Sequence, residues 1–196
     1  VPKAGEVVYT RQQEPKGLGH AVWCARHLVG DDEPFAVMLV DDLIHGETPC
    51  LAQMVDAQKK TGGNLVAVME VPAEHTARYG VIDPGETSGR LTEVKGMVEK
   101  PKPEVAPSRL AVIGRYVLRP EVFAILDAQK PGAGGEIQLT DAMARLIGRQ
   151  PFHGFRFEGT RFDCGDKLGY LEAIVAMALA REDLRAGFSE ILRRYV

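Results

Sequence analysis

The sequence predicts an α/β protein in which a mixed sheet is flanked by helices. Three observations lead to this class. In the first half of the chain, short apolar runs of strand length alternate with segments whose apolar residues recur at helical spacing. The middle of the chain contains closely spaced strands, which favours antiparallel pairing. At 196 residues, with 45% hydrophobic and 26% charged residues, we expect a single domain over residues 1–196.

The first half alternates strands and helices. Residues 6–11 carry β-branched and aromatic side chains, which predicts a strand. Residues 18–29 place apolar side chains at helical spacing and are followed by Gly30, which predicts a helix and its end. The run 34–40 is apolar throughout, as is typical of a buried parallel strand. By the same criteria we expect a helix at 51–60 and a strand at 65–71.

The second half is expected to begin with a hairpin. Its strands, 79–82 and 91–99, flank a segment rich in proline and glycine. The apolar patterns then predict a strand at 110–118, a helix from Pro120, a helix at 139–147, a strand at 152–157, a helix at 168–179 and a charged last helix.

The composition excludes several classes of protein. A formal net charge of −3 argues against a general nucleic-acid binder, which would carry a basic face. No apolar run approaches the roughly 18–20 residues that a membrane span requires. The three cysteines are far apart in sequence, which predicts free thiols in a reducing, cytoplasmic setting rather than a zinc site. Of the five histidines, His20 and His27 could share a helix face, and we expect them to be structural or surface residues.

Two aspartates follow strand-like runs, where an open α/β sheet places its functional side chains. Asp41 and Asp42 close the apolar run 34–40, and Asp163 stands in a similar context. Mg²⁺ prefers one or two carboxylates together with phosphate oxygens and water. Helix capping or turn formation explains the same residues equally well. Spacing alone cannot show that Asp41 and Asp163 meet.

A second group of residues could recognise a nucleotide. Gln12 offers a donor and an acceptor that match the N3–H and O4 edge of uracil, or of thymine. It precedes Gly17, in a glycine-containing turn that leads into a helix, where backbone N–H groups can meet a ligand. A surface glutamine and an ordinary turn are the alternatives at this stage.

Glu99 and Lys100 end a further strand. Because Pro101 favours an extended conformation for the preceding residue, we expect the two side chains to point to opposite sides of the strand. A glutamate suits sugar hydroxyls and a lysine suits a phosphate, although a solvated loop is the simpler reading. At the loop 131–138, which leads into a helix, we expect Thr140 or Asp141 to cap that helix.

Together, these segments resemble the bacterial UTP–glucose-1-phosphate uridylyltransferases, also called UDP-glucose pyrophosphorylases. KGLGHA, EIQLTDA and DCGDKLGY, in this order, carry the most specific part of the resemblance. The resembling stretches are Arg11-Gln12, KGLGHA (16–21), the strand end at Asp41, Tyr79-Gly80-Val81, VEKPKP (98–103), LAVIGRYVL (110–118), GAGGEIQLTDA (132–142) and FDCGDKLGY (162–170).

The resemblance implies a nucleotide-diphosphosugar transferase fold, which is Rossmann-like, with a mixed, mostly parallel central sheet. It implies an enzyme that forms UDP-glucose and pyrophosphate from UTP and glucose 1-phosphate, by in-line attack on the α-phosphorus. By family pattern, the metal Mg²⁺ is bound by two carboxylates and the substrates by residues of several strands and loops. The implied catalytic residues are Asp41, Lys100 and Asp163, with Asp41 and Asp163 as metal ligands; the implied substrate-binding residues are Gln12 and Gly17 for uracil, Gly80, Glu99 and Val112 to Gly114 for glucose, and Lys100 for its phosphate. The family precedent is a homo-oligomer, dimer or tetramer.

The chain departs from the family pattern in two ways. Val40 stands where the family usually has a proline before the metal-binding aspartate. The G-x-G-T-R-x-x-P loop that holds the UTP phosphates has no match, so residues 1–196 are expected to correspond to the carboxy-terminal two-thirds of the complete fold. We therefore expect no pyrophosphate release from UTP and glucose 1-phosphate by an isolated polypeptide of residues 1–196, because the main phosphate-binding cations are absent from it.

Two other functions remain open from the sequence. The first is the same chemistry with another base, as in a glucose-1-phosphate thymidylyltransferase, because Gln12 cannot distinguish uracil from thymine. Turnover with UTP against dTTP separates the two. The second is a sugar-nucleotide-binding module without catalysis, which the missing phosphate loop favours and the two retained aspartates oppose.

Overall fold

The computed structural model describes residues 2–3, 5–128 and 130–195. The chain forms two compact units. The large unit comprises Val1–Val37 and Leu51–Phe157, and the small unit comprises Met38–Cys50 and Glu158–Val196. That the whole chain acts as a single domain stays a prediction.

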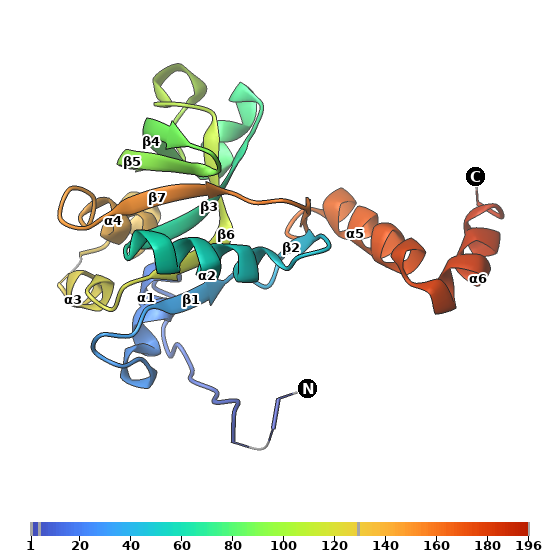
Figure 1. The fold of residues 1–196 in the computed structure, drawn as a ribbon, viewed down its shortest axis with the longest axis horizontal. Helices are drawn as coiled ribbons and strands as arrows, with labels where there is room; N and C mark the ends of the chain where they lie inside the picture. Colours follow the sequence, from blue (N-terminus) through green and yellow to red (C-terminus); the bar gives the residue numbers. More distant parts are fainter. Residues whose placement is uncertain (1, 4, 129, 196) are drawn as a thin grey trace. The chain divides into compact units, whose positions relative to one another are not determined.

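The large unit is built on a six-stranded sheet (Figure 1). Its strands are ordered β1-β6-β3-β7-β5-β4, with a further contact between β6 and β4. The strands are β1 (Phe35–Met38), β3 (Asn64–Glu70), β4 (Gly80–Ser88), β5 (Leu91–Glu99), β6 (Leu110–Leu118) and β7 (Phe152–Arg156).

The sheet is mixed, as the sequence predicts, but it is not mostly parallel. Among the registers defined in the described residues, β3 runs parallel to β7, whereas β3–β6, β4–β5, β4–β6 and β5–β7 are antiparallel. The β4–β5 hairpin lies between β3 and β6 in the chain, and β6 returns beside β3 in the opposite direction. A continuous apolar run is typical of a strand that is buried on both faces, but the run 34–40 forms the partly exposed strand β1, in which Met38 is 55% exposed. The expectation of parallel neighbours also went further than the apolar pattern allows.

Helices of the large unit cover the sheet and one another. The α-helices are α1 (Leu18–Cys24), α2 (Cys50–Thr61), α3 (Val122–Asp127) and α4 (Leu139–Ala144), and the 3₁₀ helices are η1 (Arg26–Leu28), η2 (Ala73–Arg78), η3 (Pro103–Val105) and η4 (Ala133–Gly135). Helices α1, α3 and α4 pack together. None of the helices in the described residues has the length and apolar character that a membrane-spanning helix needs.

The core of the large unit lies where the sheet meets α2 and α4. Met54 of α2, and Leu139 and Met143 of α4, are at most 1% exposed, as are Leu65 and Ile113 of the central strands. Burying one such side chain contributes roughly 1.5–3 kcal/mol. The helical and strand patterns in these segments therefore identify the core faces correctly.

Several expected elements differ from the structure: the run 34–40 forms a strand only over Phe35–Met38, and the helix expected at 139–147 ends at Ala144. Residues 6–11 form no strand, and Tyr9 is 93% exposed, because β-branched residues stabilise a strand only against a partner strand. The helix expected at 18–29 ends at Cys24 and is followed by η1. The hairpin turn lies later than expected, because β4 continues to Ser88 and Gly89, with φ of 59°, makes the turn.

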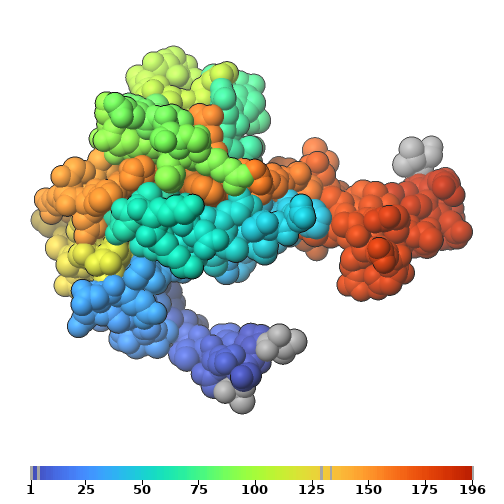
Figure 2. Space-filling view, in the orientation of Figure 1, coloured from blue at the N-terminus to red at the C-terminus, as the bar shows by residue number. Residues whose placement is uncertain are grey.

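The small unit contains a two-stranded sheet and two helices. Strands β2 (Asp42–His45) and β8 (Thr160–Asp163) pair antiparallel. Helix α5 (Lys167–Ala180) begins at Asp166, whose side chain accepts hydrogen bonds from the backbone N–H groups of Leu168 and Gly169. Helix α6 (Glu182–Leu192) follows, and both helices present much of their surface to solvent (Figure 2). Ala173 is the buried residue of α5.

Candidate functional site

The small unit brings together the two aspartates that sequence spacing could not connect. In the β2–β8 register, Asp42 lies opposite Asp163. Next to this pair, the Cys164 N–H donates to the Asp41 backbone oxygen at 2.7 Å. The two strand ends are therefore fixed to each other by backbone hydrogen bonds. The loop after β8 then turns back, and the Gly165 N–H donates to Asp163 Oδ1 at 3.2 Å.

A small gap lies between the two carboxylates. A Cβ atom placed on Gly165 would lie 3.2 Å from Asp163 Oδ1 and 3.3 Å from Asp41 Oδ2. Because one atom at that point would touch both side chains, Asp41 and Asp163 flank the same space. A glycine at position 165 keeps this space open.

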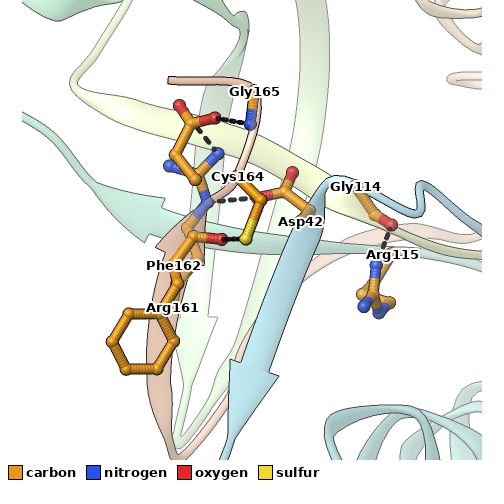
Figure 3. A network of polar contacts seen from close by, with 8 residues as sticks. Asp42, Gly114, Arg115, Arg161, Phe162, Cys164 and Gly165 are labelled. Atoms are coloured by element: carbon orange, nitrogen blue, oxygen red, sulfur yellow. Dashed lines mark hydrogen bonds and ion pairs between the residues drawn. The ribbon is translucent and has the colours of Figure 1, made fainter. Parts of the chain in front are cut away.

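Arg161 balances part of the negative charge beside this gap. Its guanidinium forms an ion pair with Asp42, and both side chains are only 10% exposed (Figure 3). Its Nη2 lies 3.5 Å from Asp163 Oδ2, so the two oxygens of Asp163 have different neighbours. The carboxylates of Asp41, Asp42 and Asp163 together with the guanidinium of Arg161 carry a net charge of −2, which favours a divalent cation.

The donor set fits a hard divalent metal with an incomplete protein shell. Asp41 and Asp163 supply carboxylate oxygens, which Mg²⁺ prefers. Among the described residues, no group of three or more His, Cys, Asp or Glu side chains could hold a metal. The protein would therefore contribute two ligands, and the other positions would be open to phosphate oxygens and water.

In the large unit, Gln12 is folded back onto the loop that follows it. Its Nε2 donates to the Gly17 carbonyl at 3.1 Å and lies 2.9 Å from His20 Nδ1. In the same loop, Lys16 Nζ lies 2.7 Å from Glu14, and its hydrogen bond and charge hold the pKa of that carboxyl below the ordinary value. The structure thus brings together Gln12 and Gly17, as the sequence predicts, and adds His20.

Gly17 and Gly19 allow this loop to pack closely against the backbone of Ile137. A Cβ on Gly17, where φ is 99°, would lie 2.9 Å from the Ile137 carbonyl oxygen, and one on Gly19 would lie 2.7 Å from it. Backbone bonds join the same two segments, from Gly19 N to Ile137 O and from Ile137 N to Lys16 O. The KGLGHA and EIQLTDA motifs therefore pack against each other.

A second cluster of the large unit forms around Gly80. Gly80 pairs with Glu99 across β4 and β5. Because Val81 lies opposite Ala111, the antiparallel register places Gly80 beside Val112 of β6. A Cβ on Gly80 would lie 3.2 Å from Thr140 Oγ1 and 3.3 Å from Glu99 Oε2. Three of the predicted sugar-binding residues, Gly80, Glu99 and Val112, therefore meet at one place.

The Glu99–Lys100 pair differs from the expected arrangement. Lys100 has φ of 48°, in the left-handed region, although Pro101 follows it. The two side chains do not diverge, because Lys100 Nζ lies 3.7 Å from Glu99 Oε1. A non-glycine residue in this region costs on the order of 1–3 kcal/mol and is typical of functional sites. The Lys100 N–H donates to the Tyr79 carbonyl, which helps to hold the turn.

Gly114 lies at an irregularity of β6. Val66 and Ala67 of β3 pair with Tyr116 and Ile113, so the register shifts at Gly114 and Arg115. The Arg115 guanidinium donates to the Gly114 carbonyl at 2.8 Å (Figure 3). A β-bulge of this kind redirects side chains and often stands next to a functional site.

Sequence reasoning missed three residues of these clusters. Arg161 stands in a short strand without apolar alternation, and His20 was expected to be structural or at the surface. Thr140 was expected to cap α4, but position 138 is the N-cap of that helix and forms no side-chain cap. Instead, the buried Thr140 faces Gly80. His20 and Thr140 lie within KGLGHA and EIQLTDA, and the resemblance that these motifs carry was the available signal for both residues.

Comparison with known proteins gives a consistent picture. The sequence family described as "Nucleotidyl transferase" matches residues 2–179. A UTP–glucose-1-phosphate uridylyltransferase of Bacillus subtilis is 51% identical over 180 residues, which are 92% of this chain and 61% of that protein. One of Komagataeibacter xylinus is 55% identical over 152 residues, or 78% of this chain and 53% of that protein. The chain thus spans less than two thirds of the length of each.

Solved structures agree with this result. A UDP-glucose pyrophosphorylase complexed with UDP-glucose is similar with a TM-score of 0.84 at 44% identity, covering 89% of this chain and 66% of that chain. A UTP-bound enzyme of the same kind from Acinetobacter baumannii gives a TM-score of 0.80 at 36% identity, covering 91% and 62%.

Proposed function

Because the chain belongs to the nucleotidyl transferase family, we propose that the protein that contains it transfers a uridylyl group from UTP to glucose 1-phosphate. The products are UDP-glucose and pyrophosphate. One observation of the structure carries the proposal: Asp41 and Asp163, 122 positions apart, face the same small gap. Relatives that share 46–55% of their residues with this chain bear the name of that activity.

Members of this family commonly need a divalent metal, and we propose Mg²⁺. Asp41 Oδ2 and Asp163 Oδ1 would hold it. When bound, the ion offsets the negative charge of the phosphates. Arg161 would keep Asp163 oriented by contacting its Oδ2, and Asp42 would hold Arg161 in place.

The large unit would recognise the two organic parts of the substrates. Gln12 would hydrogen-bond to the base, next to the Gly17 backbone. Glu99, 13% exposed at its side chain, accepts from sugar hydroxyls beside Gly80 and Val112. Lys100 is 57% exposed and carries its ammonium group close to Glu99. This cation would contact the sugar phosphate, whose oxygen attacks the α-phosphorus of UTP. Positioning and charge would supply the rate enhancement.

The proposed function is tested by pyrophosphate release from the complete protein. UTP, glucose 1-phosphate and Mg²⁺ should give turnover that is lost when Mg²⁺ is chelated. Replacing UTP with dTTP tests the thymidylyl alternative, and a higher kcat/KM with dTTP would overturn the uridylyl assignment. Binding of UDP-glucose without any turnover would instead support the binding-module function.

Replacement of Glu99 by alanine should weaken sugar recognition selectively. Losing a hydrogen bond to a charged group costs roughly 1.5–3 kcal/mol, which raises the KM for glucose 1-phosphate about 10- to 150-fold. Steady-state kinetics in each substrate measure the effect, and the KM for UTP should change little. Glu93→Ala, an exposed glutamate on the same strand β5, is the matched control. Equal losses for both substrates would contradict the sugar-binding role of Glu99.

A further inference from the structure

We infer that His20 is a positioning residue that fixes the side-chain amide of Gln12, so that Gln12 presents its carbonyl oxygen to the nucleobase. The inference rests on the proposed role of Gln12 in base recognition and adds a residue that determines specificity. It begins from two contacts of one nitrogen atom, Gln12 Nε2, with Gly17 and His20.

Counting donors and acceptors determines the orientation of the amide. A peptide carbonyl can only accept, so the Gln12 atom 3.1 Å from the Gly17 oxygen is the amide nitrogen. The second hydrogen of that nitrogen is directed to His20 Nδ1 at 2.9 Å. Nδ1 must therefore be an acceptor, and a neutral His20 carries its ring proton on Nε2. Both donors of Gln12 are used within the loop, and Oε1 is left as its hydrogen-bonding group for a ligand.

The His20 ring is itself held in place. It stacks on Trp23, with ring centroids 5.6 Å apart and planes inclined by 19°. Trp23 is fixed in turn, because its Nε1 donates to Asp127 Oδ1 at 3.1 Å and the Arg26 guanidinium lies 3.6 Å from the centre of its ring. A rigid stack of this kind keeps Nδ1 aimed at Gln12 and lowers the entropy cost of holding the amide.

An amide held in this orientation distinguishes the pyrimidines. Uracil carries a hydrogen on N3, which the Gln12 carbonyl can accept. Cytosine has a lone pair at N3, which would face the lone pairs of the same oxygen. Without the contact to His20, the amide loses one of the two bonds that set its orientation. It could then turn over and present its NH₂ group to cytosine. His20 would thereby sustain the preference for UTP over CTP.

The inference is tested with two kinds of substitution in the complete protein. His20→Phe keeps an aromatic ring on Trp23 but removes the acceptor, whereas His20→Asn restores an acceptor, Oδ1, close to the position of Nδ1. Affinities for UTP and CTP are measured by calorimetry. We expect His20→Phe to lower the UTP/CTP affinity ratio about tenfold, the value of one oriented hydrogen bond, and His20→Asn to keep the ratio within about threefold. His27→Phe, an exposed histidine of η1, is the control and should leave the ratio unchanged.

Each outcome has a definite meaning. An unchanged ratio in His20→Phe, or an equal loss in His20→Asn and His20→Phe, would overturn the positioning role. His20→Ala is a second variant without the acceptor and replaces His20→Phe if thermal melting shows that this variant is unfolded. Gln12→Ala separates the inference from the proposed function. If it leaves UTP affinity unchanged, Gln12 does not bind the base, whereas weaker UTP binding together with an unchanged ratio in His20→Phe overturns the role of His20 alone.

Discussion

Replacement of Asp163 by asparagine should reduce the rate of UDP-glucose formation at least ~100-fold in the complete protein. The substitution keeps the shape of the side chain but removes one of the two carboxylates that flank the gap beside Gly165. Loss of charge stabilisation at the phosphates is worth several kcal/mol, and each 1.4 kcal/mol is about tenfold in rate. Asp41→Asn should show a loss of similar size, because its Oδ2 lines the same space.

The measurement is pyrophosphate release as a function of Mg²⁺ concentration, together with thermal unfolding. The free energy of unfolding should change by no more than about 1 kcal/mol, since Arg161 keeps its ion pair with Asp42. Asp166→Asn is the matched control. It lies three positions away and caps α5, and asparagine caps a helix as well as aspartate does. A wild-type rate for Asp163→Asn at limiting Mg²⁺ would remove Asp163 from the metal site.

Helices and strands could be predicted from the sequence where the spacing of apolar residues matches the element that the fold forms there. Strand β6 has the predicted bounds. Helices α2 and α5 each extend one residue beyond the expected helix at both ends. In each of them, the apolar side chains recur with the period of the element, or run through it continuously. Residues 6–11 show the limit of this reasoning, because their composition suits a strand and no strand among the described residues pairs with them.

The small sheet of the candidate site could not be predicted. Strands β2 and β8 have four residues each and include Asp42, His45, Arg161 and Asp163, so no alternation of apolar and polar residues marks them. The two strands pair with each other although they are more than a hundred residues apart in the chain. The proximity of Asp41 and Asp163 follows from this pairing alone, which is why the two carboxylates could be proposed separately but not joined.

Local geometry accounts for the remaining differences. Lys100 takes up a left-handed conformation that the rule for residues before proline disfavours, and it pairs with Glu99 as a result. Gly80 lies close to Thr140, which comes from a helix 60 positions later. A rule that considers only one residue and its chain neighbour takes no account of contacts with residues from distant parts of the chain.

Replacement of Gly165 by alanine should impair the reaction while leaving the fold intact. The added methyl group would lie 3.2 Å from Asp163 Oδ1 and 3.3 Å from Asp41 Oδ2, in the space between the two carboxylates. Both neighbours are ends of side chains that can move by a few tenths of an ångström, and the φ angle of Gly165 is not in the left-handed region. We therefore expect a rate reduced about 10- to 100-fold, a higher Mg²⁺ requirement, and a free energy of unfolding within about 1 kcal/mol of wild type.

Two other glycines of the small unit make this prediction specific. Gly187 lies in α6 with no atom within 4 Å of an added Cβ, so Gly187→Ala should keep the rate and stabilise the helix by up to about 1 kcal/mol. A Cβ on Gly169 would lie 2.2 Å from the Asp163 backbone oxygen, so Gly169→Ala should lower thermal stability as well as activity. Kinetics and melting curves of the three variants distinguish a blocked site from a damaged fold. If Gly165→Ala matched Gly187→Ala in rate at every Mg²⁺ concentration, the gap between Asp41 and Asp163 would not be where the metal binds.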